Sequence, residues 1–371
     1  VITLITANST NLDSADMQTI SDQVSGNRNL IINGNMSVAQ RATSYADPTD
    51  GTYGALDRFA FFNSNDGAYT VTQDTTVPSG EGFYYSIKFD CTSTDTSIAA
   101  GQYAGAYQKI EGTNNRILGY GAAGAKTITV SFWAKSNLTG PWCYSVRNSA
   151  VDRSFIKEFT LGATDTWERI SFQVPGDTSG TWLATTGTGA VHMIALTMGS
   201  TFHGTNNTWQ SGNKTTTSNQ VNLLSNTSNE LYITGWQVEI GDVATAFEHE
   251  DYVITLNKCL RYFYRLRKTN AWGEFCTIRT YSGDDGTGII YFPQPMRAQP
   301  TLTIDKTVNS TNFAYDLNSI SVAASDANVT QIGIAAASSS GSAFVTGGGA
   351  TIQTNGGSGA IDCSFDFSAE I

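Results

Sequence analysis

The sequence predicts a mainly β protein: a jelly-roll β-sandwich, then one connecting α-helix, then a small C-terminal β-domain. Three observations lead to this prediction. Before residue 250, apolar side chains alternate with period two in one segment after another, with no helical pattern between them. Residues 251–268 carry a period near 3.6 instead. After them, short strand-like segments lie among Ser, Ala and Gly.

Composition and charge exclude several classes of protein. The chain has 371 residues, enough for two or three domains. Only 14% of the residues are charged, while the hydrophobic share of 40% excludes a disordered chain. The net charge of −11 argues against a nucleic-acid-binding surface. No apolar run reaches the ~18 residues of a membrane span, and we expect no secretion signal.

The first two predicted regions are a connector arm over residues 1–28 and the jelly roll over residues 29–250. The arm has one short apolar patch and no core of its own. The jelly roll opens on NLIINGNMSVAQR, in which Asn33-Gly34 predicts a tight turn. In its last strand the alternation changes face at Gly235, which predicts a β-bulge. The clearest strand patterns cover Phe83–Cys91, Ile128–Lys135, Ile170–Val174, Val191–Met198 and Leu231–Ile240.

Residues 251–268 predict a linker helix with an apolar stripe. Acidic residues stand at its start and basic residues at its end, and each sign suits the helix dipole there. The stripe has two interpretations: it packs on the preceding sandwich, or it forms a self-association seam between copies near a threefold axis. The candidate interface residues are Tyr252, Leu256, Leu260 and Phe263.

Residues 269–371 predict a small β-domain with few large aliphatic side chains. A hairpin turn is expected at Ser282–Gly286. Because so few apolar side chains can be buried, one copy of this domain would be only marginally stable by itself. A core shared among several chains would stabilise it. Its predicted strands are Trp272–Ile278, Gly288–Phe292, Thr301–Ile304, Gln331–Ala335 and Ile361–Phe367.

The sequence shows no catalytic motif, and we expect neither an enzyme nor a cofactor. Its histidines, His192, His203 and His249, are too dispersed for a metal triad, and no G-x-S-x-G occurs. The five scattered cysteines predict free thiols. A structural calcium lacks support, because Asp284-Asp285-Gly286 is better explained as a turn. Many Asp and Glu residues could form a glycosidase pair, and the sequence selects none.

Sugar binding needs aromatic faces beside hydrogen-bonding groups, and five residues are candidates. Trp133 lies on the polar face of its strand, whereas Trp142 and Tyr144 follow Gly140-Pro141. Trp182 and Trp209 stand in polar stretches. The alternative for each is packing beneath a loop or at a subunit contact. Because no cation cluster is visible outside the helix, the sequence predicts a neutral glycan.

Several blocks resemble tail fibres and related virion appendage proteins of tailed bacteriophages. The resemblance covers roughly residues 29–371, but only in these blocks. The N-terminal part of these proteins is similar to a carbohydrate-binding-module jelly roll, which is the fold implied for residues 29–250. The blocks are NLIINGNMSVAQR with LDRF, ELYITGWQVEIGDVATAFEHEDY with KCLRYFYR, YFPQPMRAQPTLT and FDFSAEI.

The resemblance implies a virion protein assembled in the host bacterial cytoplasm. We expect a homotrimeric tail-fibre or receptor-binding subunit that recognises host surface polysaccharide, with its arm contacting other virion proteins. Neither nucleic acid nor membrane insertion is expected. Two alternatives remain: a ligand-free head or tail decoration protein, and a polysaccharide depolymerase. Against the second, no parallel β-helix repeat is visible.

Overall fold

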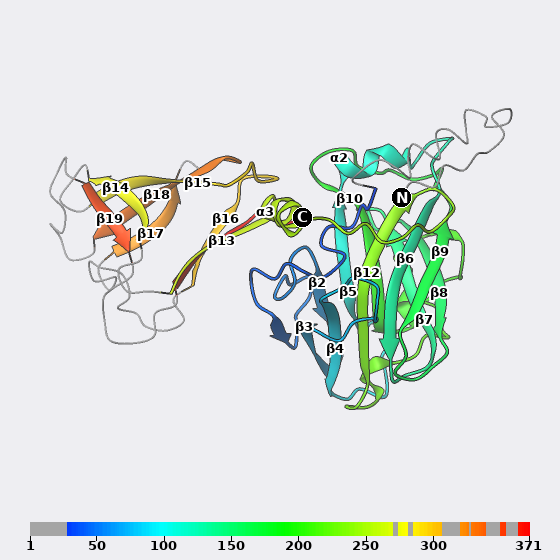
Figure 1. The fold of residues 1–371 in the computed structure, drawn as a ribbon. Helices are drawn as coiled ribbons and strands as arrows, with labels where there is room; N and C mark the ends of the chain where they lie inside the picture. The colour runs from blue at the N-terminus through cyan, green and yellow to red at the C-terminus, as the bar shows by residue number, and fades with distance from the viewer. Residues whose placement is uncertain are drawn as a thin grey trace. The chain divides into compact units, whose positions relative to one another are not determined.

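The structure is a computed structural model that divides into two compact units. The first runs to Glu250 and the second begins at Asp251. Figure 1 shows the elements of both units, with labels on most of the strands and on helices α2 and α3. The structure describes residues 28–269, 274–280, 285–305, 320–325, 328–338, 349–353 and 363–371. Most of the predicted connector arm therefore lies outside the described residues.

The first unit is a sandwich of two six-stranded sheets. All the strand pairs within each sheet are antiparallel. We name each sheet after its central strand. The β12 sheet contains, in spatial order, β1 (Ser44–Ala46), β3 (Ala68–Asp74), β4 (Ser86–Ser93), β12 (Glu230–Ile240), β6 (Ile128–Ser136) and β9 (Glu168–Val174).

The second sheet of this unit, the β10 sheet, lies against the first. As the chain proceeds it crosses repeatedly from one sheet to the other, which is the jelly-roll arrangement that the sequence predicts. The prediction of a mainly β protein with a jelly-roll sandwich is confirmed. The β10 sheet contains, in spatial order, β11 (Trp209–Ser211), β8 (Arg153–Leu161), β7 (Gly140–Arg147), β10 (Thr188–Met198), β5 (Tyr103–Glu111) and β2 (Ala60–Asn63).

Both sheets place one apolar face in a shared core. The inward residues of β4 are those that the sequence alternation selects, Ile87, Phe89 and Cys91. From the opposite sheet, β10 contributes Ile194 and Leu196. Such alternation is what a half-buried strand requires, because successive side chains point to opposite faces.

The bulge predicted at Gly235 is confirmed. The register between β12 and β6 shifts between Thr234 and Gln237. Gly235 has φ of +64°, and a Cβ there would approach Cζ of Phe83 to 2.6 Å. Glycine is therefore required by backbone conformation and by space.

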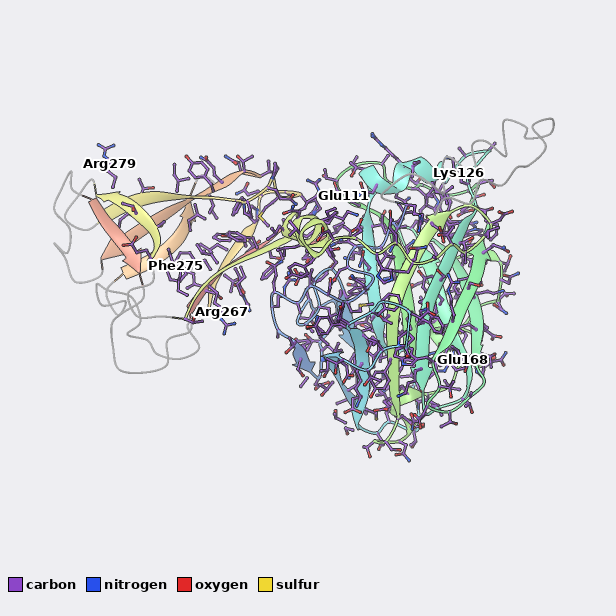
Figure 2. All side chains as sticks on the ribbon, viewed as in Figure 1. Glu111, Lys126, Glu168, Arg267, Phe275 and Arg279 are labelled. Atoms are coloured by element: carbon purple, nitrogen blue, oxygen red, sulfur yellow. The ribbon has the colours of Figure 1, made fainter. Side chains whose placement is uncertain are left out.

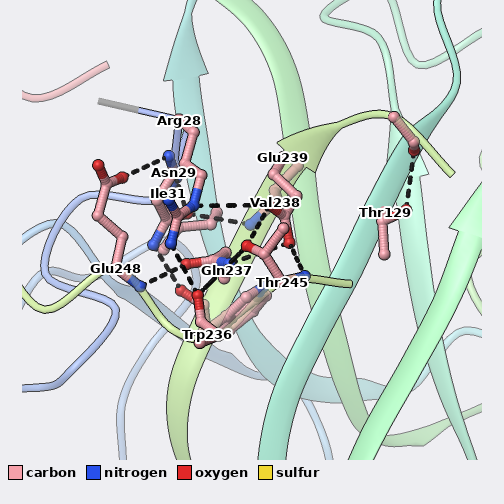
Figure 3. A network of polar contacts seen from close by, with 12 residues as sticks. Arg28, Asn29, Ile31, Thr129, Trp236, Gln237, Val238, Glu239, Thr245 and Glu248 are labelled. Carbon is pink, nitrogen blue, oxygen red and sulfur yellow. Dashed lines mark hydrogen bonds and ion pairs between the residues drawn. The ribbon is translucent and has the colours of Figure 1, made fainter. Parts of the chain in front are cut away.

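A polar network, which we call the clasp, joins both ends of this unit to β12 (Figure 3). Asn29 Oδ1 accepts from the backbone N–H groups of Ile31 and Val238, and Asn29 Nδ2 donates to Trp236 O. On the returning segment, Thr245 donates to the carboxylate of Glu239 through its backbone N–H and its hydroxyl. The side chains of the clasp are Arg28, Asn29, Gln237, Glu239, Thr245 and Glu248.

The clasp explains two of the sequence blocks that resemble phage proteins. Asn29 opens the first block, while Gln237 and Glu239 belong to the second. Gln237 and Glu239 are buried although they face away from the sandwich core, because the flanking segments cover them. These residues therefore hold chain segments together.

The second unit contains two further sheets. Phe275 and Arg279 lie on β14, one of its strands (Figure 2). The core includes a stacked pair, Phe275 and Phe365, with ring centroids 4.4 Å apart. The sheets contain, in spatial order, β13 (Phe263–Lys268), β20 (Cys363–Ser368) and β16 (Thr301–Asp305), and β17 (Ile320–Ser325), β18 (Gln331–Ser338), β15 (Asp285–Tyr291), β14 (Glu274–Thr280) and β19 (Gly349–Gln353).

The predicted helix over residues 251–268 is too long. The helix α3 spans Tyr252–Leu260, and Phe263–Lys268 forms strand β13 instead. Pairing with β20 and two hydrogen bonds between the Arg265 guanidinium and the Asp366 carboxylate stabilise this strand. Because these partners lie about a hundred residues away, the local apolar spacing could not show them.

The other strand predictions in this unit mostly locate real strands. β14 and β15 pair antiparallel as a hairpin, although the predicted turn falls largely outside the described residues. α3 also belongs to this unit, since Arg297 N donates to Arg261 O at 2.7 Å, just beyond the helix end. Among the described residues, no helix is long and apolar enough to cross a membrane.

Candidate functional site

Two of the five sugar-binding candidates, Trp142 and Tyr144, are core residues. Both are 0% exposed. The sequence interpretation failed because Gly140-Pro141 resembles a loop, whereas β7 begins there and runs between β8 and β10. Neither residue can offer an aromatic face to a ligand.

Tyr144 belongs to a buried hydrogen-bonded chain. Its hydroxyl lies 2.8 Å from Nδ1 of His192 and accepts from Nε1 of Trp236 at 3.1 Å. Burial raises the pKa of Tyr144 well above its ordinary value and lowers the pKa of His192 to about 3. Both groups are therefore neutral at pH 7.

Trp182 and Trp209 are brought together, in an aromatic cluster with Tyr120. The ring centroids of Trp182 lie 4.8 Å from those of Tyr120 and 5.5 Å from those of Trp209. Both indole N–H groups donate to backbone carbonyls, of Ser179 and Pro175. Both indole N–H groups are thus engaged, and both half-buried rings pack against one edge of the core. Their role as ligand contacts remains a prediction.

Trp133 lies on the other sheet, away from the Trp182–Trp209 cluster. It is half-buried on β6, opposite Arg169 of β9 and Thr234 of β12. The five predicted residues thus do not form one platform.

A cavity of about 280 Å³ lies on the face of the β10 sheet that points away from the core, and we call it the outer-face pocket. Its size is just below the ~300–1,000 Å³ of typical small-molecule sites. Sequence reasoning missed all of its residues. They are Asp50, Phe62, Tyr103, Tyr107, Arg147, Met193, Met198, Phe202, Asn213 and Thr215.

The floor of this pocket is formed by the side chains of β5 and β10 that alternate with core residues and therefore point outward. On β5, Ala104 and Ala106 face the core, so Tyr103 and Tyr107 face outward. Met193 of the adjacent strand β10 pairs directly with Tyr107. The same parity gives a small second apolar cluster on this outer face.

The polar stretch between Gly199 and Asn222 folds over this face and forms one wall. Phe202 O accepts from Thr215 N at 2.9 Å, which closes the segment on itself. Thr215 Oγ1 contacts Met198 Sδ at 2.9 Å, and Lys214 Nζ donates to Thr201 O at 2.8 Å. Phe202, Asn213 and Thr215 are thereby fixed beside the strands.

The loop that carries Asp50 forms another part of the pocket lining. Thr52 and Phe61 exchange two backbone hydrogen bonds, which fix the loop to β2. Gly51 has φ of +70°, and a Cβ there would approach the Tyr107 hydroxyl to 3.1 Å. The glycine lets the loop turn close to the aromatic floor.

Four aromatic side chains gather in the outer-face pocket. Phe62 stacks on Tyr107 with ring centroids 5.6 Å apart. Tyr103 lies 5.8 Å from Phe62 and meets Phe202 edge to face at 5.4 Å. Tyr103 and Phe202 are only half-buried, so they can contact a ligand.

Hydrogen-bonding groups surround these rings. The Tyr103 hydroxyl lies 3.3 Å from Asp50 Oδ2. Burial and the Asp50 charge raise the pKa of Tyr103, so its hydroxyl remains a donor. Arg147 Nη1 donates to Asn213 Oδ1 at 2.6 Å. The pocket therefore combines an apolar floor with polar walls.

Nothing in the described residues suggests a metal or a reactive thiol. No cluster of three or more His, Cys, Asp or Glu side chains suits a metal ion in that part of the chain. Burial raises the pKa of Cys143 and of Cys276 to about 11, so neither is an activated nucleophile.

The four interface candidates have unequal exposure. Tyr252 is 54% exposed at the start of α3, next to exposed Val253 and Ile254. Leu256 is half-buried, whereas Leu260 and Phe263 are buried within the chain itself. Phe263 also belongs to β13 rather than to the helix. Self-association remains a prediction.

Comparisons with known proteins found structural likeness only. No family model matches the chain, and no protein of curated function matches it. A putative sugar binding protein from Bacteroides thetaiotaomicron is 13% identical, with a TM-score of 0.33 over 57% of this chain and 100% of that one. A family 11 carbohydrate-binding module from Clostridium thermocellum, in complex with a mixed-linked tetrasaccharide, is 13% identical, with a TM-score of 0.27 over 57% and 99%.

A phage protein is also among the similar structures. The enzymatically active domain of tailspike protein 4 from bacteriophage CBA120 is 13% identical, with a TM-score of 0.30. The match covers 58% of this chain and 22% of the tailspike chain. These likenesses are too slight to transfer a ligand or an activity to this chain.

Proposed function

We propose that the first unit is a non-catalytic carbohydrate-binding domain and that its ligand occupies the outer-face pocket. The observation that carries this proposal is the half-exposed pair Tyr103 and Phe202 beside the polar groups of Asp50 and Asn213. A sugar ring has an apolar C–H face and polar edges. An aromatic floor with polar walls is complementary to both.

Binding without hydrolysis fits the charges in the pocket. Glycoside hydrolysis generally uses two carboxyl groups on opposite sides of the scissile bond. Among the described residues that line the pocket, Asp50 alone carries a carboxylate. Its contact with Tyr103 suits it to accept a hydrogen bond from a sugar hydroxyl.

We further propose that this binding serves attachment of a bacteriophage to its host, in a tail-fibre or receptor-binding subunit. The sequence blocks that resemble virion appendage proteins support this, and so does the presence of an accessible aromatic pocket. A ligand-free decoration protein would not need such a pocket. We propose the homotrimer as the assembled form, with Tyr252 at a contact between copies.

The proposal is tested by screening the protein on a bacterial glycan array and titrating the best ligand by calorimetry. Tyr103→Ala and Phe202→Ala should each weaken binding roughly 5- to 30-fold, equivalent to about 1–2 kcal/mol. Their melting temperatures should stay near that of the parent, because both rings pack on the small outer cluster and not on the main core of the sandwich.

Tyr84→Ala is the matched control. Tyr84 is 83% exposed in the same unit and does not line the pocket, so its loss should leave binding unchanged. Unchanged binding by both pocket variants would place any glycan site elsewhere. Failure of the parent to retain any glycan, or to adsorb to host cells, would favour the architectural alternative.

A further inference from the structure

Arg147 is a half-buried cation that forms no ion pair with another described residue. It lies on β7 with its side chain on the outer face and lines the pocket. Its Nη1 donates to Asn213 Oδ1, but its Nε is buried and has no hydrogen-bond partner in the described part of the chain. The ion pairs found among those residues do not include Arg147.

Such a guanidinium is costly to keep in place. Burial lowers the pKa of Arg147, because removal from water disfavours the charged form, and the interactions with Tyr107 and Asp50 offset part of this effect. Arginine nevertheless remains charged at pH 7. A buried charge is normally paired, so an unpaired one beside an open cavity is suited to an anion brought by a ligand.

Arg147 keeps one donor group for a ligand. Asn213 occupies Nη1 and Nε is buried, which leaves the N–H groups of Nη2. A carboxylate that accepts a hydrogen bond from Nη2 also compensates the charge, so the bond is charge-assisted. A neutral sugar hydroxyl can accept the same bond but leaves the charge uncompensated.

A second cation lies on the same face. Val191 of β10 pairs with Lys109 of β5 on one side and with Arg147 of β7 on the other. Lys109 shares the outward parity of Tyr107, and its Nζ lies 5.5 Å from the centroid of that ring. Two strand spacings separate the backbones of the two cations, roughly 9–10 Å.

The charges that line the pocket differ from the charge of the whole chain. Arg147 and Asp50 are the charged residues of the lining, and Asp50 lies 3.3 Å from the Tyr103 hydroxyl. Beside the lining, Lys109 and Glu111 share the outward face of β5. The chain as a whole has a net charge of −11. The neutral-glycan prediction did not include a cation in the site, because Arg147 is brought to the aromatic floor only by the pairing of β7 with β10.

We propose that the outer-face pocket selects acidic saccharides, whose sugar carboxylate accepts from Nη2 of Arg147 while Lys109, beside the Tyr107 ring, adds a second positive charge. This proposal rests on the proposed function of the same pocket and names its ligand class. The aromatic floor holds the sugar ring, and the guanidinium selects the charge.

The first test uses the unaltered protein and matched ligands. Galacturonan, glucuronan and mannuronan fragments are each paired with the same fragment after reduction of its carboxyl groups to alcohols. Calorimetry at low salt should show at least one acidic fragment bound tenfold or more tightly than its neutral partner. The difference should shrink as salt is raised, because screening weakens the ionic contact. Comparison with a sulfated fragment of equal charge shows whether the protein recognises the carboxylate itself or only the negative charge.

Variants assign the preference to Arg147. Arg147→Gln should bring the affinity for the acidic fragment down to that for its neutral partner. Arg147→Lys should retain part of the preference, because the charge remains although the planar guanidinium that bonds Asn213 is lost. Arg116→Gln removes an exposed arginine that does not line the pocket, and it should change neither affinity. Melting temperatures are measured for all three variants.

The outcomes separate this inference from the proposed function. Equal or tighter binding of the neutral partners by the unaltered protein overturns the acidic preference and leaves carbohydrate binding intact. Binding of neither set, together with an empty glycan array, overturns both. If Arg147→Gln fails to fold, the matched ligands and the substitution Lys109→Gln test the acidic preference instead. Lys109→Gln should lower the affinity for the acidic fragment and leave that for its neutral partner unchanged.

Discussion

The side-chain carbonyl of Asn29 accepts a hydrogen bond from the backbone N–H of Val238 at 3.0 Å. The two residues are 209 positions apart in the chain. The same side chain donates to Trp236 O at 3.1 Å, so it bonds the backbone of β12 on both sides of Gln237. One asparagine thus fixes the first described segment to the last strand of the sandwich.

Asn29→Ala should lower the free energy of unfolding of the first unit by about 2–3 kcal/mol. The change leaves the Val238 N–H and the Trp236 carbonyl without their side-chain partner in a partly buried site. Urea unfolding followed by tryptophan fluorescence measures the effect. Asn114→Ala, at an exposed position of the short helix α2 (Gly112–Asn115), should change stability by less than about 0.5 kcal/mol. Equal effects would mean that the clasp contributes nothing specific.

Stability should fall with acid because of His192. Its pKa is about 3 in the folded protein and about 6.5 in an unfolded chain, so between these values the unfolded state binds more protons. The stabilisation is complete above pH 6.5 and is lost as the pH falls toward 3. The expected slope is about 1.4 kcal/mol per pH unit within that window. Denaturant titrations at pH 7, 6, 5 and 4 measure it.

The non-titrating variant His192→Gln provides the comparison. It should be less stable at pH 7, since the hydrogen bond to Tyr144 is altered. Its stability should nevertheless change less steeply between pH 6.5 and 4 than that of the parent. Parallel profiles for the two proteins would contradict the assignment to His192.

Trp182→Ala and Trp209→Ala should reduce stability and leave glycan affinity unchanged. Both side chains are half-buried against the core, so truncation should cost somewhat less than the ~3–5 kcal/mol of a fully buried aromatic. Neither residue lines the outer-face pocket. Calorimetric titration of the folded variants measures affinity. A selective loss of binding at unchanged stability would restore them as ligand contacts.

Tyr252→Asp should lower the assembly state if copies meet at α3. The side chain is 54% exposed, so an aspartate there does not disturb the fold of one chain. A shared interface would have to bury the new charge, which is unfavourable. Light scattering of the full chain at micromolar concentration measures the mass. Leu260→Asp is unsuitable, because Leu260 is buried in its own unit and the variant would unfold it.

Sequence patterns predicted the features that depend on local alternation. The inward residues of β4 and the bulge at Gly235 follow from period two and its interruption. The end of α3 was missed because Phe263 and Leu266 fit both a helical stripe and a strand, and only pairing with β20 distinguishes them.

The candidate site depends on contacts that no local pattern contains. Tyr103 and Arg147 come from strands on either side of β10, and Phe202 comes from a segment that looks like an unstructured polar loop. Outward parity on β5 was the one available signal, since Tyr103 and Tyr107 alternate with two small alanines. To select Tyr103 and Tyr107 over other outward-facing aromatic residues, one must know which sheet face is not covered by other segments of the chain.

The direct bond between the two ends of the first unit has a mechanical consequence. The Asn29 backbone N–H donates to Glu248 Oε2 at 2.9 Å, so the chain enters and leaves this unit at neighbouring points. A force that pulls the two flanking segments apart acts first on the hydrogen bonds of the clasp, because these join Asn29 to Glu248 directly. The sheets behind it bear little of the load. A ligand held on the opposite face of the sandwich would therefore stay bound under tension until the clasp gives way.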